Sequence, residues 1–257
     1  MKFRCFLCAL AIILATSCQN KTEENEHIVR EHNLNEAALL NTRLGLAYLK
    51  QGDRPRAKRK LVTALDQAPD SPNVNSAMAY FMEKTGMLDN ARIYYHKALS
   101  VAPNNGAQLN NYGAFLCRQE HYKQAEQYFL RAIKDMHYDN TAAAYENAGL
   151  CALAEPEDDK AKLYFNKALE QDPSRKQSLY ELVQLEIKNN HQTAALNLLQ
   201  KYPNISLRDA KLLKIAANVA KRAGKQDLEA DYRALLQQLS SVAEKTGVKN
   251  EPSNNLG

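Results

Sequence analysis

The stretch "LGLAYLKQGDRPRAKRKLVTALDQAP", residues 44–69, contains the spacing of residues that determines the fold. It begins with a Leu-Gly pair and ends at a proline, with aromatic, aliphatic and small residues between them: Leu44-Gly45, Tyr48, Ala57, Leu61, Ala64 and Pro69. Similar residues recur along the chain with a period of about 34 residues, which indicates an array of structural repeats. They are Ala91, Ala98 and Pro103 in the second copy, Ala125 and Ala132 in the third, where His137 replaces the proline, and Ala148-Gly149, Ala161, Phe165, Ala168 and Pro173 in the fourth.

The period and the order of these residues resemble the tetratricopeptide repeat, in which each repeat is a pair of antiparallel helices. We therefore predict an all-α fold, a tetratricopeptide-repeat superhelix (right-handed α-solenoid) of about six helical hairpins. The repeat domain is predicted over 37–240, with repeats near 38–71, 72–105, 106–139, 142–175, 176–205 and 206–240. The fourth copy is shifted by about two residues, which we place in the turn around 137–141. The last two copies match less well, as expected of terminal repeats.

The recurring residues have a physical role in such a fold. Small residues such as Gly45, Ala57 and Ala64 stand where two helix backbones approach closely. Prolines such as Pro69 end the second helix of each hairpin, because the residue before a proline disfavours the helical conformation. No single repeat can bury its apolar face, so the repeats must stack.

The N-terminus has the layout of a secretory signal peptide over residues 1–17. Lys2 and Arg4 precede the apolar run "CFLCALAIILA", which is too short to span a bilayer as a helix. A buried N-terminal helix is the alternative, but the polar residues that follow could not cover it. Removal of this segment would lower the net charge from +5 to +3, too small a value to indicate a nucleic-acid partner.

The small residues that run into Cys18 resemble a bacterial lipobox, in which the cysteine is acylated, for example with palmitate, and becomes the new N-terminus. Ala15 stands where that signal usually has leucine, and Gln19 is not the aspartate that retains lipoproteins at the inner membrane. The resemblance implies an outer-membrane lipoprotein that faces the periplasm. We expect a flexible tether over 18–36 and a polar disordered tail over 241–257.

Two of the five cysteines leave with the signal peptide and Cys18 is assigned to the lipid, so Cys117 and Cys151 remain. In an oxidising compartment this pair could form a disulfide. The two residues fall on the first helices of neighbouring repeats, whose axes lie about 8–10 Å apart, so a bond is feasible. Two small buried thiols are the alternative.

A search for catalytic or metal-binding patterns finds none. The histidines are far apart and have no second ligand at helical spacing: His96, His121, His137 and His191. No glycine-rich phosphate loop and no G-x-S-x-G motif are present. The acidic run at 155–159 is expected to begin a helix, where carboxylates suit the helix dipole. We predict that the protein is not an enzyme and binds no metal, cofactor or small-molecule substrate.

The one dense basic stretch is "RPRAKRK", residues 54–60. A solvated face of the second helix of the first repeat explains it most simply. Contact with anionic lipid headgroups or with an acidic protein is the other interpretation, because this repeat lies nearest to the tether.

Register positions that point into the groove of tetratricopeptide stacks give candidate partner-binding residues. They are Thr42, Leu46, Leu49 and Lys50 in the first repeat, Asn73, Ser76, Tyr80 and Glu83 in the second, Asn110, Cys117 and Arg118 in the third, and Glu146, Leu150 and Leu153 in the fourth. Packing between repeats is the alternative role of each leucine. Thr42 and Leu46 occupy the positions of a Lys/Asn carboxylate clamp, so that binding mode is disfavoured.

Three stretches go beyond the general repeat pattern: "RLGLAYLKQGDRPRAKRKL" from Arg43, "NNYGAFLCRQEHYKQAEQYFLRAI" from Asn110 and "AAAYENAGLCALA" from Ala142. Over residues 38–240 they resemble the type IV pilus biogenesis and stability lipoproteins, the pilotins of the pilus secretin. The resemblance implies that Cys18 carries lipid and that the pilus secretin subunit is the protein partner. It places secretin contact in the early repeats, at Leu46, Leu49 and Tyr80, with Asn110 and Asn111 as further candidates. A general periplasmic scaffold for another envelope complex is the alternative function.

Overall fold

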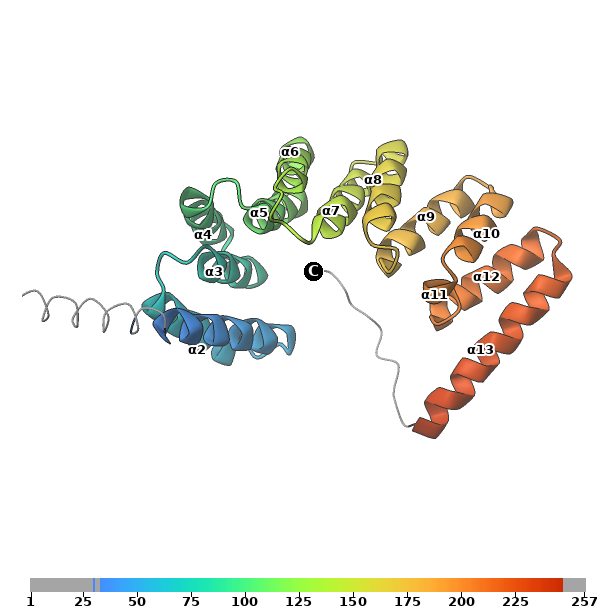
Figure 1. Ribbon diagram of the computed structural model, residues 1–257, viewed down its shortest axis with the longest axis horizontal. Coiled ribbons are helices and arrows are strands. Elements are labelled where there is room, and N and C mark those ends of the chain that lie inside the picture. The colour runs from blue at the N-terminus through green and yellow to red at the C-terminus, as the bar shows by residue number, and fades with distance from the viewer. Residues whose placement is uncertain (1–29, 31–32, 247–257) are drawn as a thin grey trace, which may run out of the picture. The chain divides into compact units, whose positions relative to one another are not determined.

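A computed structural model describes residue 30 and residues 33–246. The chain divides into two compact units, one that ends at Asn111 and one that starts at Tyr112, within helix α5 (Gly106–Arg118). Every regular element of the described residues is a helix, and consecutive helices form hairpins (Figure 1). The predicted all-α repeat fold is confirmed.

The first unit contains a helix over residues 33–50, followed by α2 (Arg54–Gln67), α3 (Pro72–Lys84), α4 (Leu88–Val101) and the first half of α5. Asp53 caps α2, because its Oδ1 accepts a hydrogen bond of 3.0 Å from the backbone N–H of Arg56. The helix ends just before Ala68-Pro69, as the proline predicts. One core cluster of this unit forms around the buried residues Ala57, Leu61, Ala77, Met78 and Phe81.

The second unit contains the second half of α5 and the helices that follow it. Its helices are α6 (Tyr122–Ile133), α7 (Thr141–Ala154), α8 (Asp158–Gln171), α9 (Lys176–Lys188), α10 (Gln192–Lys201), α11 (Pro203–Ser206), α12 (Ala210–Arg222) and α13 (Gln226–Thr246). Within it, α7 pairs with α8, α9 with α10 and α12 with α13 (Figure 1). The acidic residues Asp158 and Asp159 occupy the first turn of α8, where we expected them.

Three glycines hold the two helices of a hairpin at close distance. A Cβ atom on Gly45 would lie 2.6 Å from Leu61 Cγ, and one on Gly149 would lie 2.6 Å from Phe165 Cε1. The same atom on Gly113 would lie 2.9 Å from Phe129 Cε1. The prediction that small residues mark close helix approach is therefore confirmed, because even a methyl group would force the aromatic or leucine side chain to move.

The turn inside each hairpin uses a residue in the left-handed backbone region. Gly86 has φ 84° in the second repeat, and the equivalent residue of the third repeat, Glu120, has φ 62°. A left-handed conformation is costly for any residue that carries a Cβ atom. The repeats thus share one turn geometry, but some of them reach it with a strained residue.

The repeat domain departs from its predicted boundaries at both ends. Residues 33–36 are already helical, before the predicted start at 37, and α13 continues to Thr246, beyond the predicted end at 240. The connection between α6 and α7 spans 134–140 and is longer than the 102–105 connection between α4 and α5, which accounts for the shifted fourth copy. Burial raises the pKa of Tyr138 in this connection to about 12.

No described helix combines the length and the apolar character needed to span a bilayer. The predicted signal peptide, Cys18, the segment 19–29 and the end of the tail, 247–257, lie outside the described residues.

Candidate partner-binding surfaces

Leu46 and Leu49, the first candidates for partner contact, are only half-buried. Both pack against the core cluster that includes Leu61 and Phe81. Each leucine therefore serves the stacking of the first two repeats and still presents part of its side chain to solvent. Both roles that the sequence left open are compatible with this position.

Thr42 does not line the groove as its register position predicted. Its side chain is 5% exposed, and its hydroxyl donates a hydrogen bond of 2.7 Å to the carbonyl oxygen of Ala38. A threonine in a helix can satisfy its hydroxyl on the preceding turn in this way. The prediction for Thr42 is wrong because the first helix turns this side chain into the hairpin.

Tyr80 on α3 is half-buried and keeps part of its ring accessible. The ammonium group of Lys84, one turn later, lies 5.1 Å from the ring centroid. An aromatic ring beside a cation is a surface that can contact both apolar and acidic groups of a partner.

The polar candidates of α3 are used inside the first unit. The Ser76 hydroxyl donates to Oε1 of Gln108 on α5, and Gln108 Nε2 donates to Asn73 Oδ1 at 2.7 Å. Ser76 and Gln108 are both buried. Ser76 therefore joins the second repeat to the third, and its predicted role in the groove is wrong.

Asn110 and Asn111, which are neighbours in α5, have different environments. Asn110 is buried, with 8% of its side chain exposed, whereas Asn111 is exposed. Successive helical residues differ by about 100° in direction, so one can face solvent while its neighbour is buried. Asn110 is a structural residue and its prediction as a partner contact is wrong; Asn111 is accessible.

Glu146 on α7 is committed to an ion pair in the second unit. Its carboxylate accepts a bond of 2.6 Å from the guanidinium of Arg175, one of 2.8 Å from the Ser178 hydroxyl and one of 3.1 Å from the Ser178 backbone N–H. The carboxylate side chain is 12% exposed and the arginine 23% exposed. This group joins the fourth repeat to the fifth and is not available to a partner.

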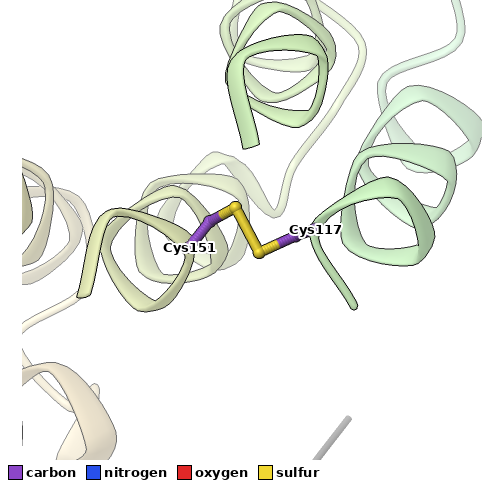
Figure 2. Close-up of a disulfide and its surroundings, with 2 residues drawn as sticks. All are labelled: Cys117 and Cys151. Atoms are coloured by element: carbon purple, nitrogen blue, oxygen red, sulfur yellow. A yellow bond between two sulfur atoms is a disulfide. The ribbon is translucent and has the colours of Figure 1, made fainter. Parts of the chain in front are cut away.

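Cys117 on α5 and Cys151 on α7 form a disulfide in the structure, with their Cα atoms 5.8 Å apart. Figure 2 shows the two side chains pointing toward each other from neighbouring helices. Of the two arrangements that the sequence allowed, the structure has the bond. It ties the third repeat to the fourth within the second unit.

The sequence analysis assigned no groove residues in the last two repeats, where the structure brings an aromatic ring and a cation together. Lys211 on α12 places its ammonium group 3.7 Å from the ring centroid of Tyr180 on α9. Burial raises the pKa of the neighbouring Glu181 carboxyl, while a hydrogen bond from Gln177 and the charge of Lys211 oppose that shift. The groove register, extended to the fifth copy from residue 176, would have found Tyr180, but the predicted start of the sixth copy at 206 would not have placed Lys211 at a groove position.

The basic stretch 54–60 forms an exposed face of α2, the solvated face that explains it most simply. Arg56 pairs with Asp53 at 3.3 Å, and Lys60 donates to Asn41 Oδ1 at 3.2 Å. Arg54, Lys58 and Arg59 are exposed and have no ion pair with another described side chain. Within 54–60 the stretch thus presents three exposed cations that pair with no acid among the described residues.

Across residues 33–246, no three His, Cys, Asp or Glu side chains are placed to hold one metal ion. His191 lies 2.8 Å from Glu186 at the exposed turn between α9 and α10. Burial alone would raise the pKa of the Glu186 carboxyl, but the bonds from Lys162 and His191 outweigh it and hold the pKa below its usual range.

The profile of the tetratricopeptide repeat family matches residues 42–107 and 116–176. These two ranges contain the first four predicted repeats almost completely.

The chain is similar over nearly its whole length to the type IV pilus assembly protein PilF of Pseudomonas aeruginosa. The two are 29% identical over 239 residues, which are 93% of this chain and 94% of PilF. The solved structure of Pseudomonas aeruginosa PilF has a TM-score of 0.64 and 31% identity, and the match covers 80% of this chain and 93% of that one. The solved structure of PilW, a widely conserved type IV pilus biogenesis factor, has a TM-score of 0.63 at 24% identity, covers 81% and 99% of the two chains, and shows the common fold.

Proposed function

Because this chain belongs to the tetratricopeptide-repeat family and is homologous to the type IV pilus assembly protein PilF, we propose that it is an adaptor of pilus biogenesis. In this proposal it is an outer-membrane lipoprotein, a pilotin, that binds the pilus secretin subunit. It promotes the localisation of the subunit to the outer membrane and its assembly into multimers. The role is one of protein binding and involves no catalysis.

The observation that carries the proposal is a stack of helical hairpins that matches PilF along nearly its entire length. Such stacks bind peptides and helices of other proteins along their first helices. A chain that shares both the fold and the extent of PilF is expected to act in the same assembly.

The proposed anchor is the acylated Cys18. One acyl chain holds a protein to a membrane only weakly, whereas two or more hold it stably, at about 0.8 kcal/mol per buried CH₂ group. A shared membrane tether raises the effective concentration of adaptor and secretin subunit, and binding covers apolar subunit surfaces before they aggregate. The Cys117–Cys151 bond supports an exported protein, since disulfides persist in oxidising compartments.

We place secretin contact on the early repeats, at the exposed parts of Leu46, Leu49 and Tyr80. These side chains belong to the helices that line the groove, and the Tyr80 ring has a cation beside it. The matched control is Ile93 on α4, which is 64% exposed but lies on a second helix.

The proposal is tested in a strain that lacks the gene, complemented with wild type or with Cys18→Ser. We expect secretin multimers and pili to be lost without the protein and reduced when Cys18→Ser prevents acylation. Tyr80→Ala is expected to lower secretin capture about tenfold and Ile93→Ala less than about twofold, because central aromatic contacts dominate interfaces. Unchanged multimers and intact pili in the deletion strain would contradict the adaptor role. Co-purification of cell-wall enzymes or barrel-assembly proteins without secretin would instead support the general scaffold.

A further inference from the structure

Three lysines form a stripe along the exposed side of α12: Lys211, Lys214 and Lys221, with the exposed Asn218 among them. At 3.6 residues per turn these residues lie within about 80° of arc and extend over about 15 Å of helix. We call this surface the lysine stripe. It belongs to the first helix of the last repeat, the helix type that lines the groove.

Two of the three charges of the lysine stripe have no ion-pair partner among the described side chains of the second unit. Neither Lys214 nor Lys221 forms an ion pair with a described side chain, and α12 contains no acidic residue. The acid at the start of the helix, Asp209, is already bound to Lys176 at 2.9 Å. Lys211 interacts with the half-buried Glu181, whose carboxyl pKa its charge lowers.

Helix stability does not account for the whole stripe. Lys221 lies in the last turn of α12, where a cation interacts favourably with the helix dipole. Lys211 lies in the first turn, where a positive charge is unfavourable. Its ammonium group is instead held over the Tyr180 ring of α9, so the stripe and the ring form one surface across two helices.

We propose that the lysine stripe, together with Tyr180, binds an acidic peptide segment of a protein partner in extended conformation. An extended chain rises about 3.3 Å per residue, so five residues span the stripe. Alternate residues of such a chain point to the same side, which would bring two or three carboxylates opposite the lysines. An apolar residue at one end of the segment would contact Tyr180. The inference rests on the proposed function only in requiring that the partner is a protein.

A peptide fits this surface better than a bilayer does. The stripe is narrow and includes a ring from a neighbouring helix, which suits one bound strand more than a flat sheet of headgroups. The exposed cations of α2, by contrast, lie near the proposed anchor at the other end of the chain. They provide a matched control with the same number of charges.

The test measures the binding of a fluorescein-labelled ten-residue peptide to the detergent-solubilised full chain. The peptide has aspartate at alternate positions and one phenylalanine; a second peptide has asparagine in place of each aspartate. The stripe variant is Lys211→Gln/Lys214→Gln/Lys221→Gln and the control variant is Arg54→Gln/Lys58→Gln/Arg59→Gln. All six residues are exposed, and circular dichroism verifies that both variants fold.

We expect the stripe variant to bind the acidic peptide about tenfold more weakly and the control variant to bind it within about twofold of wild type. Raising the salt from about 50 to about 300 mM should weaken wild-type binding about fivefold, because exposed charge pairs are screened. Equal losses in the two variants, equal binding of the asparagine peptide, or binding of phosphatidylglycerol vesicles without peptide binding would each overturn the proposal.

The two proposals fail separately in this design. If wild-type protein binds the peptide through the lysine stripe but captures no secretin, the adaptor role is wrong and the site stands. If secretin is captured and the stripe variant binds the peptide as well as wild type does, the site is wrong and the adaptor role stands.

Discussion

The junction between the second and third repeats and the junction between the fourth and fifth use equivalent positions with different chemistry. In the first unit, Ser76 donates to Gln108, 32 residues later. In the second unit, Glu146 accepts from Ser178, also 32 residues later, and holds the guanidinium of Arg175 as well. One junction is neutral and the other is charged.

The repeat pattern therefore determines at which positions neighbouring repeats are joined by side-chain hydrogen bonds, which we call links. It does not determine whether the residues at these positions are neutral or charged. Removing one partner of a buried neutral hydrogen bond costs about 1–3 kcal/mol, and leaving a largely buried charge without its partner costs more. The second unit also has the Cys117–Cys151 bond between its first two repeats. We therefore expect the second unit to depend more strongly on single residues and on solution conditions than the first.

The largest expected effect is that of reducing the disulfide. The bond closes a loop with a sequence separation of 34, and its loss should cost roughly 3–4 kcal/mol on the chain-entropy account. Calorimetry with and without reductant, or of Cys117→Ser/Cys151→Ser, measures it. Hydrogen exchange should locate the change in residues 112–246; an equal loss of protection in the first unit would break the comparison.

Removal of the charged link should cost somewhat less. Glu146→Ala leaves Arg175 half-buried without its carboxylate, and we expect a loss of about 2–3 kcal/mol in unfolding free energy, because part of the pair is solvated. Urea unfolding of the variant provides the value. A double variant with Arg175→Met should recover part of the loss, and failure to recover any would show that the ion pair is not the cause.

The neutral link should be worth less than the charged one. Ser76→Ala removes one donor to Gln108 and should cost about 1 kcal/mol, since Gln108 retains its bond to Asn73. The same urea experiment applies. A cost equal to that of Glu146→Ala would remove the distinction between the two junctions.

A smaller effect on stability is expected from a reciprocal pair of substitutions in the hairpin turns, one in each unit. Glu120→Gly relieves a left-handed residue in the second unit and should stabilise it by about 0.5 kcal/mol, after the entropy of glycine is counted. Gly86→Glu imposes the same strain on the first unit and should destabilise it by about 1 kcal/mol. If the two substitutions shift the unfolding temperature in opposite directions, the repeats share one turn geometry. Shifts in the same direction would contradict it.

The smallest effect concerns pH. Burial alone would raise the pKa of Asp209, but hydrogen bonds from Lys176 and the Leu212 N–H outweigh it and hold the pKa below its usual range. A lowered pKa in the folded state adds stability above the unfolded value of about 3.9, and this is lost as the pH falls through the folded value. Because Lys176 is 45% exposed, we expect about 0.5 kcal/mol, lost below about pH 4. Asp209→Asn should flatten this part of the stability profile, and an unchanged profile would show that another group titrates.

The fold was predictable because its signals repeat. Gly45, Gly113 and Gly149 recur where the helices meet, and Pro69 ends α2 as expected. The orientation of single side chains was predicted less accurately than the fold. Register alone cannot tell whether a polar side chain such as Ser76 faces the groove or the next repeat, because the two directions differ by a small rotation.

The polar links themselves carried a signal that was not used. Polar residues at the fifth position of one repeat and the third of the next occur together at Ser76 and Gln108 and again at Glu146 and Ser178. Such a pair predicts a junction rather than a binding site. The lysine stripe was missed for another reason: the sixth copy matches the repeat pattern weakly, so its groove positions were not assigned.

The adaptor role is tested most directly by affinity capture of the full acylated chain from detergent-solubilised envelopes, followed by identification of the bound protein. We predict that the pilus secretin subunit is recovered with wild type and that Cys18→Ser, although folded, recovers much less of it from intact cells. Recovery of other envelope proteins with no secretin, from a chain shown by mass spectrometry to carry its lipid, would contradict the adaptor role.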